Sequence, residues 1–190
     1  MEIKISWSFF VERLREILRI PRNFFQKVEK EKGRDIALSY FSILLFIKVC
    51  LTFLEKTVIE PVGAGLFPSL IVRSGLAISL LVVTLVMTFI FEIVLSFVGA
   101  GVLHIWIKLF KGKGSYDKSY QLYVYASTPS LLLSWLPFLG IIGWLYGIYL
   151  LVVGTQVLHS VSKTKAILIY ILPVILFILA VVSTLYSFFK

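Results

Sequence analysis

The sequence predicts an all-α polytopic membrane protein with five transmembrane helices behind an N-terminal amphipathic helix. Hydrophobic residues make up 59% of the 190 residues and charged residues only 15%, whereas soluble domains are about one quarter charged. From residue 36 onward, the apolar stretches are as long as membrane spans, because a hydrocarbon core about 30 Å thick takes about 20 helical residues. The basic residues are concentrated before and between these stretches. Together these features exclude a soluble domain.

Five apolar stretches are the candidates for the spans. Four have the length of a single membrane helix, namely Ile36–Leu54, Tyr120–Phe138, Leu139–Leu158 and Ala166–Phe189. The other stretch, Gly75–Phe110, is longer than a span needs, since its helix would extend about 54 Å. If this stretch formed two spans joined by a hairpin, Glu92 would be the only residue left for the turn. We therefore expect one tilted helix that projects beyond the membrane, with a bend most easily placed at Gly99–Gly101.

The positions of the basic residues predict the orientation. The segments 1–35, 108–119 and 159–165 hold nine, four and two lysines or arginines, and the segments on the other side hold three. The positive-inside rule then places the N-terminus in the cytoplasm and the C-terminus outside. We expect a multi-pass protein of the cell membrane. Residues 1–34 form its cytoplasmic N-terminal segment, which keeps its N-terminus, and residues 35–190 form the transmembrane domain.

Residues 7–19 have the pattern of an amphipathic helix. At 100° per residue, one face carries the apolar side chains Trp7, Phe10, Val11, Leu14 and Leu18, and charged residues occupy most of the rest. Pro21 ends this helix, and a second short helix is expected over Asn23–Lys32. The first helix either lies on the inner leaflet or packs on the cytoplasmic ends of the bundle.

Lys48 and Glu92 are the two charged residues that lie well inside spans. Counted from the expected inner boundary, Lys48 is 13 residues past Asp35 and Glu92 is 16 residues before Lys108. These separations correspond to depths of about 20 and 24 Å, so the two side chains are expected at matching levels.

Glu92 also belongs to a polar stripe that includes Thr88 and Ser96, spaced one helical turn apart. Such a stripe should face protein, because polar groups that face lipid are costly. Three interpretations stay open. Lys48 and Glu92 form a structural pair, Glu92 serves a proton or cation path, or both groups reach water unpaired.

A stripe of small residues runs along the fourth expected span, on which four glycines share one face: Gly140, Gly143, Gly147 and Gly154. It contains a GxxxG motif, which lets another helix approach closely. The partner helix belongs either to this chain or to a second copy.

Motifs for chemistry are scarce. Cys50 is expected as a small buried hydrophobic residue, and His104 and His159 as separate interfacial residues. With no catalytic or metal-binding pattern in the sequence, we expect no enzyme activity, no cofactor and no metal. No nucleic-acid partner is expected, because the basic residues set topology. The scarcity of Asn and Gln hints at a thermophilic source.

The order of several short motifs is similar to that of a known family. Four of them carry the resemblance most clearly: Pro21–Phe25, Lys111–Tyr116, Tyr123–Pro129 and the run Gly140–Gly143 after Leu136-Pro137. Together with Leu150–Leu158 and Ser162–Ala166, they resemble the YIP family of five-span membrane proteins in its prokaryotic form.

The resemblance implies a cytosolic N-terminus and a role in membrane traffic or membrane shaping. The Asp-Leu-Tyr-Gly-Pro element of the eukaryotic members, which interact with Rab-type GTPases, has no counterpart here, so a GTPase partner is not implied. We expect a non-enzymatic scaffold, adaptor or bilayer-shaping protein. Its partners are the lipid bilayer and other membrane proteins or itself. The alternative is a small permease or channel component that uses Glu92.

Overall fold

The computed structural model describes residues 6–59, 75–136 and 138–188, and all the regular elements in these ranges are helical. The α-helices are α1 (Trp7–Arg19), α2 (Pro21–Glu29), α3 (Asp35–Leu54), α6 (Gly75–Leu109), α7 (Tyr116–Ala126), α8 (Thr128–Leu133), α9 (Leu139–Leu158) and α10 (Lys163–Phe188). A π-helical turn, η1 (Glu55–Ile59), extends α3. The all-α fold class is therefore confirmed.

Several helix bounds agree with the sequence pattern. α1 covers residues 7–19 as expected, and the Ser6 side chain caps it by accepting a hydrogen bond from the Phe9 N–H. The bounds of α9 are those of the predicted span. α2 begins at Pro21, two residues before the predicted start, because proline is well tolerated in the first helical turn, where its missing N–H costs nothing.

Four helical segments among the described residues are long and apolar enough to cross a membrane: 35–57, 77–109, 139–158 and 163–184. The expected span Tyr120–Phe138 is not a single helix, which makes the predicted count of five approximate. Its residues form the end of α7 and all of α8. Ser127 separates the two helices, two residues before Pro129, which has no N–H to donate and restricts the residue that precedes it.

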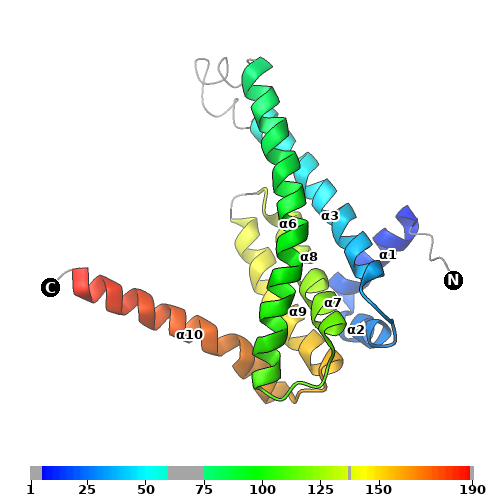
Figure 1. The fold of residues 1–190 in the computed structure, drawn as a ribbon, viewed down its shortest axis with the longest axis vertical. Coiled ribbons are helices and arrows are strands. Elements are labelled where there is room, and N and C mark those ends of the chain that lie inside the picture. Colours follow the sequence, from blue (N-terminus) through cyan, green and yellow to red (C-terminus); the bar gives the residue numbers. More distant parts are fainter. Residues whose placement is uncertain (1–5, 60–74, 137, 189–190) are drawn as a thin grey trace.

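α6 is one continuous helix of 35 residues, and no hairpin interrupts it at Glu92. Figure 1 shows it running the full height of the molecule beside α3, with the short helix α7 packed at its lower half. The helix continues through Gly99–Gly101 without interruption. This length agrees with the predicted helix that exceeds one membrane thickness.

The buried core lies where α1, α2, α3, α7 and α9 meet. Phe10 and Phe25 from the N-terminal helices pack there with Tyr40, Tyr125 and Leu150. The N-terminal segment thus contributes to the same core as the membrane helices. α10 contacts the bundle through its first turns and then runs away from it (Figure 1).

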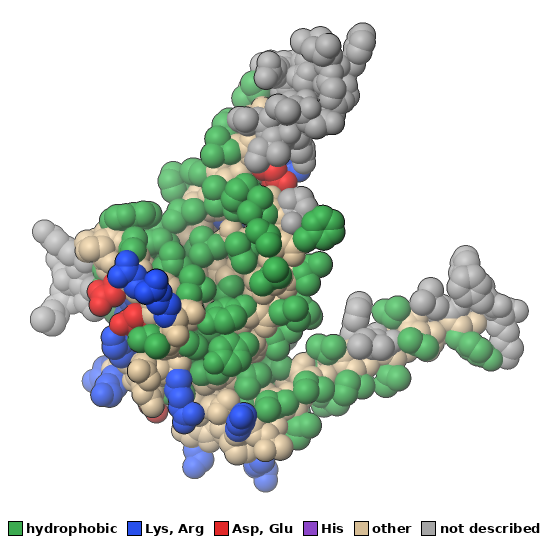
Figure 2. All heavy atoms as spheres, turned by 180° about the vertical axis from the view of Figure 1, so that it is seen from behind, with side chains coloured by type: hydrophobic (Ala, Val, Ile, Leu, Met, Phe, Trp, Pro, Cys, Tyr) green, Lys and Arg blue, Asp and Glu red, His purple; other side chains and the backbone are tan. Residues whose placement is uncertain are grey.

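The outside of the bundle is mostly apolar, as a lipid environment requires. Figure 2 shows hydrophobic side chains over most of the visible face, with lysines and arginines gathered towards one end. Exposed apolar residues are frequent on α6, α9 and α10. Cys50 is also exposed on α3, which corrects the expectation that it is buried.

Candidate functional site

Lys48 of α3 and Glu92 of α6 form an ion pair inside the membrane-spanning part of the bundle. The Lys48 Nζ donates a hydrogen bond to Glu92 Oε1, and the two side chains are 22% and 25% exposed. Because each charge neutralises the other, the pair reduces the cost of keeping both groups away from water. Of the three interpretations open from the sequence, this geometry favours the structural pair.

The rest of the polar stripe on α6 faces protein. Ser96 is fully buried, and its hydroxyl donates to the Ile93 carbonyl and lies 3.2 Å from the Tyr120 hydroxyl of α7. Thr88 is half-buried. At the next position of the stripe, a Cβ on Gly99 would lie 2.8 Å from the Tyr123 ring. The stripe therefore joins α6 to α3 at Glu92 and to α7 further along.

The glycine stripe of α9 packs against α7, α8 and α2 of the same chain. A Cβ on Gly143 would lie 2.6 Å from the Pro129 carbonyl oxygen, and one on Gly147 would lie 3.0 Å from that of Ala126. On Gly154 it would meet the side chains of Leu122 and Phe25. A Cβ on Gly140 has its nearest neighbour at 3.6 Å, which is ordinary contact. Of the two partners left open, the structure uses a helix of this chain.

The predicted apolar face of α1 divides into a packed part and an exposed part. Phe10 is buried and its ring lies 5.0 Å from that of Tyr40, while Val11 and Leu14 are half-buried. Trp7 is 67% exposed and Leu18 40%. α1 therefore packs on the bundle with only part of this face and leaves two large apolar side chains uncovered.

Arg13 and Ile17 are buried residues of α1 that sequence reasoning missed, and Arg13 is the polar one. The amphipathic pattern places it among the charged, solvent-facing positions, yet its side chain is buried. It donates hydrogen bonds to the Tyr125 hydroxyl of α7 and to Glu31, with which it also forms an ion pair. Its guanidinium lies 4.5 Å from the centre of the Phe9 ring. No local pattern marks this role, because Tyr125 is 112 residues away.

Two further contacts hold the N-terminal helices against the bundle. The Tyr146 hydroxyl of α9 donates to the Leu18 carbonyl over 2.9 Å. The Lys118 ammonium donates to the carbonyl of Val28 in the last turn of α2 and to that of Glu31, which follows the helix. Burial lowers the pKa of Lys118, while neighbouring carboxylates oppose the shift.

These contacts fix the level of α1 along α9. Tyr146 lies 12 residues before Leu158, the last residue of α9. At 1.5 Å per residue, the C-terminal end of α1 is therefore about 18 Å from the end of α9. The C-terminal end of α1 thus meets the side of α9 and not its tip.

His104 and His159 are brought together, although the sequence predicts them as separate interfacial residues. The Ser119 hydroxyl lies 2.8 Å from His104 Nδ1 and 3.2 Å from His159 Nε2. A hydroxyl has one proton, so it donates to one ring and accepts from the other. His159 is fully buried, and its Nδ1 has no hydrogen-bond partner in the described part of the chain.

Burial lowers the pKa of His159 to about 4, and the charges of His104 and Lys108 act in the same direction. The neutral form therefore predominates near pH 7. The connection between α6 and α7 closes over this ring, since a Cβ on Gly114 would lie 2.5 Å from Nδ1. The arrangement ties α6, α7 and the end of α9 together. Among the described residues, no group of three or more His, Cys, Asp or Glu side chains is placed to hold a metal ion.

Comparison with known proteins gives one match. The family model described as the Yip1 domain matches residues 15–184, which is most of the chain. No curated protein and no solved structure matches significantly.

Proposed function

Because the chain belongs to the Yip1 domain family, we propose that it is a non-enzymatic membrane scaffold or adaptor that shapes the bilayer around it. The proposal includes the orientation expected from the basic residues, with the N-terminus in the cytoplasm. α1 and α2 then lie at the inner leaflet of the cell membrane.

The observation that carries this proposal is the level at which α1 is held. The Tyr146–Leu18 hydrogen bond keeps α1 about 18 Å from the cytoplasmic end of α9. The exposed residues of α1 include Glu12, Arg15 and Arg19. Charged groups at that depth in hydrocarbon would cost several kcal/mol, so lipid headgroups and water must reach them. In this proposal, the boundary of the inner leaflet lies at the level of α1, so the leaflet is thinned on this side of the protein.

The exposed apolar residues of α1 support the same proposal. Trp7 and Leu18 are uncovered beside these charges. An amphipathic helix with such residues inserts at the boundary between headgroups and acyl chains. In this protein the Arg13 and Tyr146 contacts hold the helix to the bundle, so the leaflet adapts to the helix.

Vesicle shape tests the proposal. The purified chain is reconstituted into liposomes as the wild type, as Arg13→Gln and as Arg15→Gln, and vesicle diameters are measured by electron cryomicroscopy. Arg13→Gln removes the guanidinium that joins Tyr125 to Glu31, whereas Arg15 is exposed on the same helix. We expect smaller vesicles with the wild type and Arg15→Gln than with Arg13→Gln or with lipid alone. Equal diameters for all samples at equal protein density would contradict the proposal.

The permease alternative depends on Glu92 being available to an ion. The ion pair with Lys48 opposes ion binding at Glu92, whereas the 25% exposure of the Glu92 side chain favours it. Proton or cation flux into proteoliposomes distinguishes the two functions. If the protein is a scaffold, the wild type and Glu92→Gln should show the same background flux. A flux that the wild type supports and Glu92→Gln abolishes would establish the permease.

A further inference from the structure

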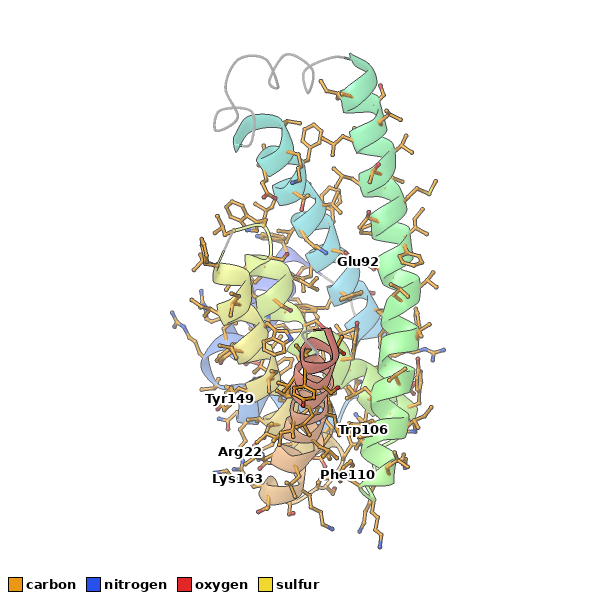
Figure 3. All side chains as sticks on the ribbon, turned by 90° about the vertical axis from the view of Figure 1, so that its left-hand side faces the viewer. Arg22, Glu92, Trp106, Phe110, Tyr149 and Lys163 are labelled. Carbon is orange, nitrogen blue, oxygen red and sulfur yellow. The ribbon has the colours of Figure 1, made fainter. Side chains whose placement is uncertain are left out.

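A hollow opens on the bundle where α2, α9 and α10 meet. Its volume is about 420 Å³. Arg22 comes from the first turn of α2 and Lys163 is the first residue of α10, and α9 supplies the wall between them. Figure 3 shows Arg22, Lys163 and Tyr149 on the same side of the bundle, with Tyr149 further from its lower end.

The lining of the hollow is divided by polarity along α9. The polar residue Gln156 lines the hollow near the end of α9, while Tyr149, Val152 and Val153 continue the wall away from the end of the helix. From Gln156 to Tyr149 the wall rises about 10 Å. The hollow thus has a cationic mouth and a mostly apolar upper wall.

The two cations at the mouth are not neutralised by protein. No acidic side chain is among the residues that line the hollow. Within the described ranges, neither Arg22 nor Lys163 takes part in an ion pair. Two like charges that share one hollow gain most from a ligand that carries negative charge.

The position of the hollow fits the membrane. Lysines and arginines gather towards the same end of the bundle (Figure 2), and the helices that form the upper wall are apolar enough to lie in lipid. Basic pockets between membrane helices at such a boundary bind anionic lipid headgroups. A ligand that fills both halves of the hollow needs an anionic head and an apolar tail.

We propose that the hollow between α2, α9 and α10 binds one anionic phospholipid. Its phosphate lies between Arg22 and Lys163, and an acyl chain follows the wall formed by Val153 and Tyr149. The site holds this lipid in place, in addition to the lipid that surrounds the whole protein. This inference does not depend on thinning of the leaflet by α1.

Native mass spectrometry of the full chain tests the site. Protein in detergent is titrated with phosphatidylglycerol or phosphatidylcholine, and the lipid-bound fraction is measured. The test variant is Arg22→Gln with Lys163→Gln. The matched control is Lys30→Gln with Lys165→Gln, which removes two exposed charges from the C-cap of α2 and from α10 outside the hollow. We expect the wild type and the control to bind phosphatidylglycerol, and the test variant to bind it roughly tenfold more weakly.

A second variant tests the apolar half. Val153→Trp fills the hollow without a change of charge and should also reduce binding of phosphatidylglycerol, provided that circular dichroism and gel filtration match the wild type. If it perturbs the fold, Ile167→Trp on the α10 side replaces it. Equal binding of phosphatidylcholine, an equal loss in the lysine control, or full competition by inorganic phosphate would each overturn the proposal.

Discussion

At the residue scale, Lys48 and Glu92 decide how α3 and α6 meet inside the membrane. In the pair, each charge compensates the other within an apolar environment. If one partner is removed, the other charge is left without compensation, which costs roughly 3–5 kcal/mol in soluble proteins.

We predict that Glu92→Leu destabilises the protein more than Lys48→Met combined with Glu92→Leu. The double variant leaves no uncompensated charge, so part of the stability returns. Thermal unfolding in detergent micelles, followed by circular dichroism, measures Glu92→Leu, Lys48→Met and the double variant. Simple addition of the two single effects would show that the residues are not partners.

The second prediction at this scale concerns His159 and pH. Its pKa is about 4 in the folded protein, and the ordinary value of about 6.5 applies to the unfolded chain. Between these values the unfolded state binds the extra proton, so stability is complete above about pH 6.5 and decreases as the pH falls.

At pH 5 the expected loss is about 2 kcal/mol relative to pH 7.5. We predict that the melting temperature of the wild type falls more between these pH values than that of His159→Gln, measured in the same detergent. Both proteins carry the same Glu and Asp side chains, so the difference between their profiles reports on His159. Parallel pH profiles would contradict the assignment.

At the scale of elements, the glycines of α9 set how closely α7 and α8 can approach. Gly143 has no room for a methyl group beside the Pro129 carbonyl, which is backbone and cannot rotate away. Gly140 has ordinary space around it although it lies on the same face. Gly140 is therefore a matched control for a substitution at Gly143.

We predict that Gly143→Ala lowers stability by about 1–3 kcal/mol, the usual range for overpacking. Gly140→Ala should be neutral or slightly stabilising, because alanine favours the helix. Gly147→Leu should destabilise as well, since its larger side chain points at the Ala126 carbonyl. Thermal unfolding and gel filtration in detergent measure stability and oligomeric state. A change in oligomeric state without a loss of stability would place the stripe at a contact between copies.

At the scale of the whole molecule, the basic residues predict the orientation in the membrane. Residues 4 and 190 both lie outside the described ranges, but each can carry an engineered cysteine in a Cys50→Ser background. We predict that a membrane-impermeant maleimide added outside cells labels position 190 and not position 4. Labelling of position 4 alone would reverse the topology.

Much of this fold could be predicted because a lipid environment allows few backbone structures. A backbone inside hydrocarbon must satisfy its own hydrogen bonds, so long apolar stretches become helices. The bounds of α9, the extent of α1 and the continuity of α6 follow from this rule and from local periodicity. The depths of Lys48 and Glu92 could be matched for the same reason, since a helix converts residue number into distance.

Only the tertiary structure decided which helices face one another. The division of the expected span Tyr120–Phe138 into α7 and α8, the burial of Arg13 and the His104–Ser119–His159 chain depend on contacts between residues far apart in sequence. The hollow at Arg22 and Lys163 is formed by three helices that have no shared sequence pattern. Local apolar length and periodicity determine that a helix forms and which of its faces is apolar. Packing against distant side chains determines which face is covered, and at what level along its neighbour.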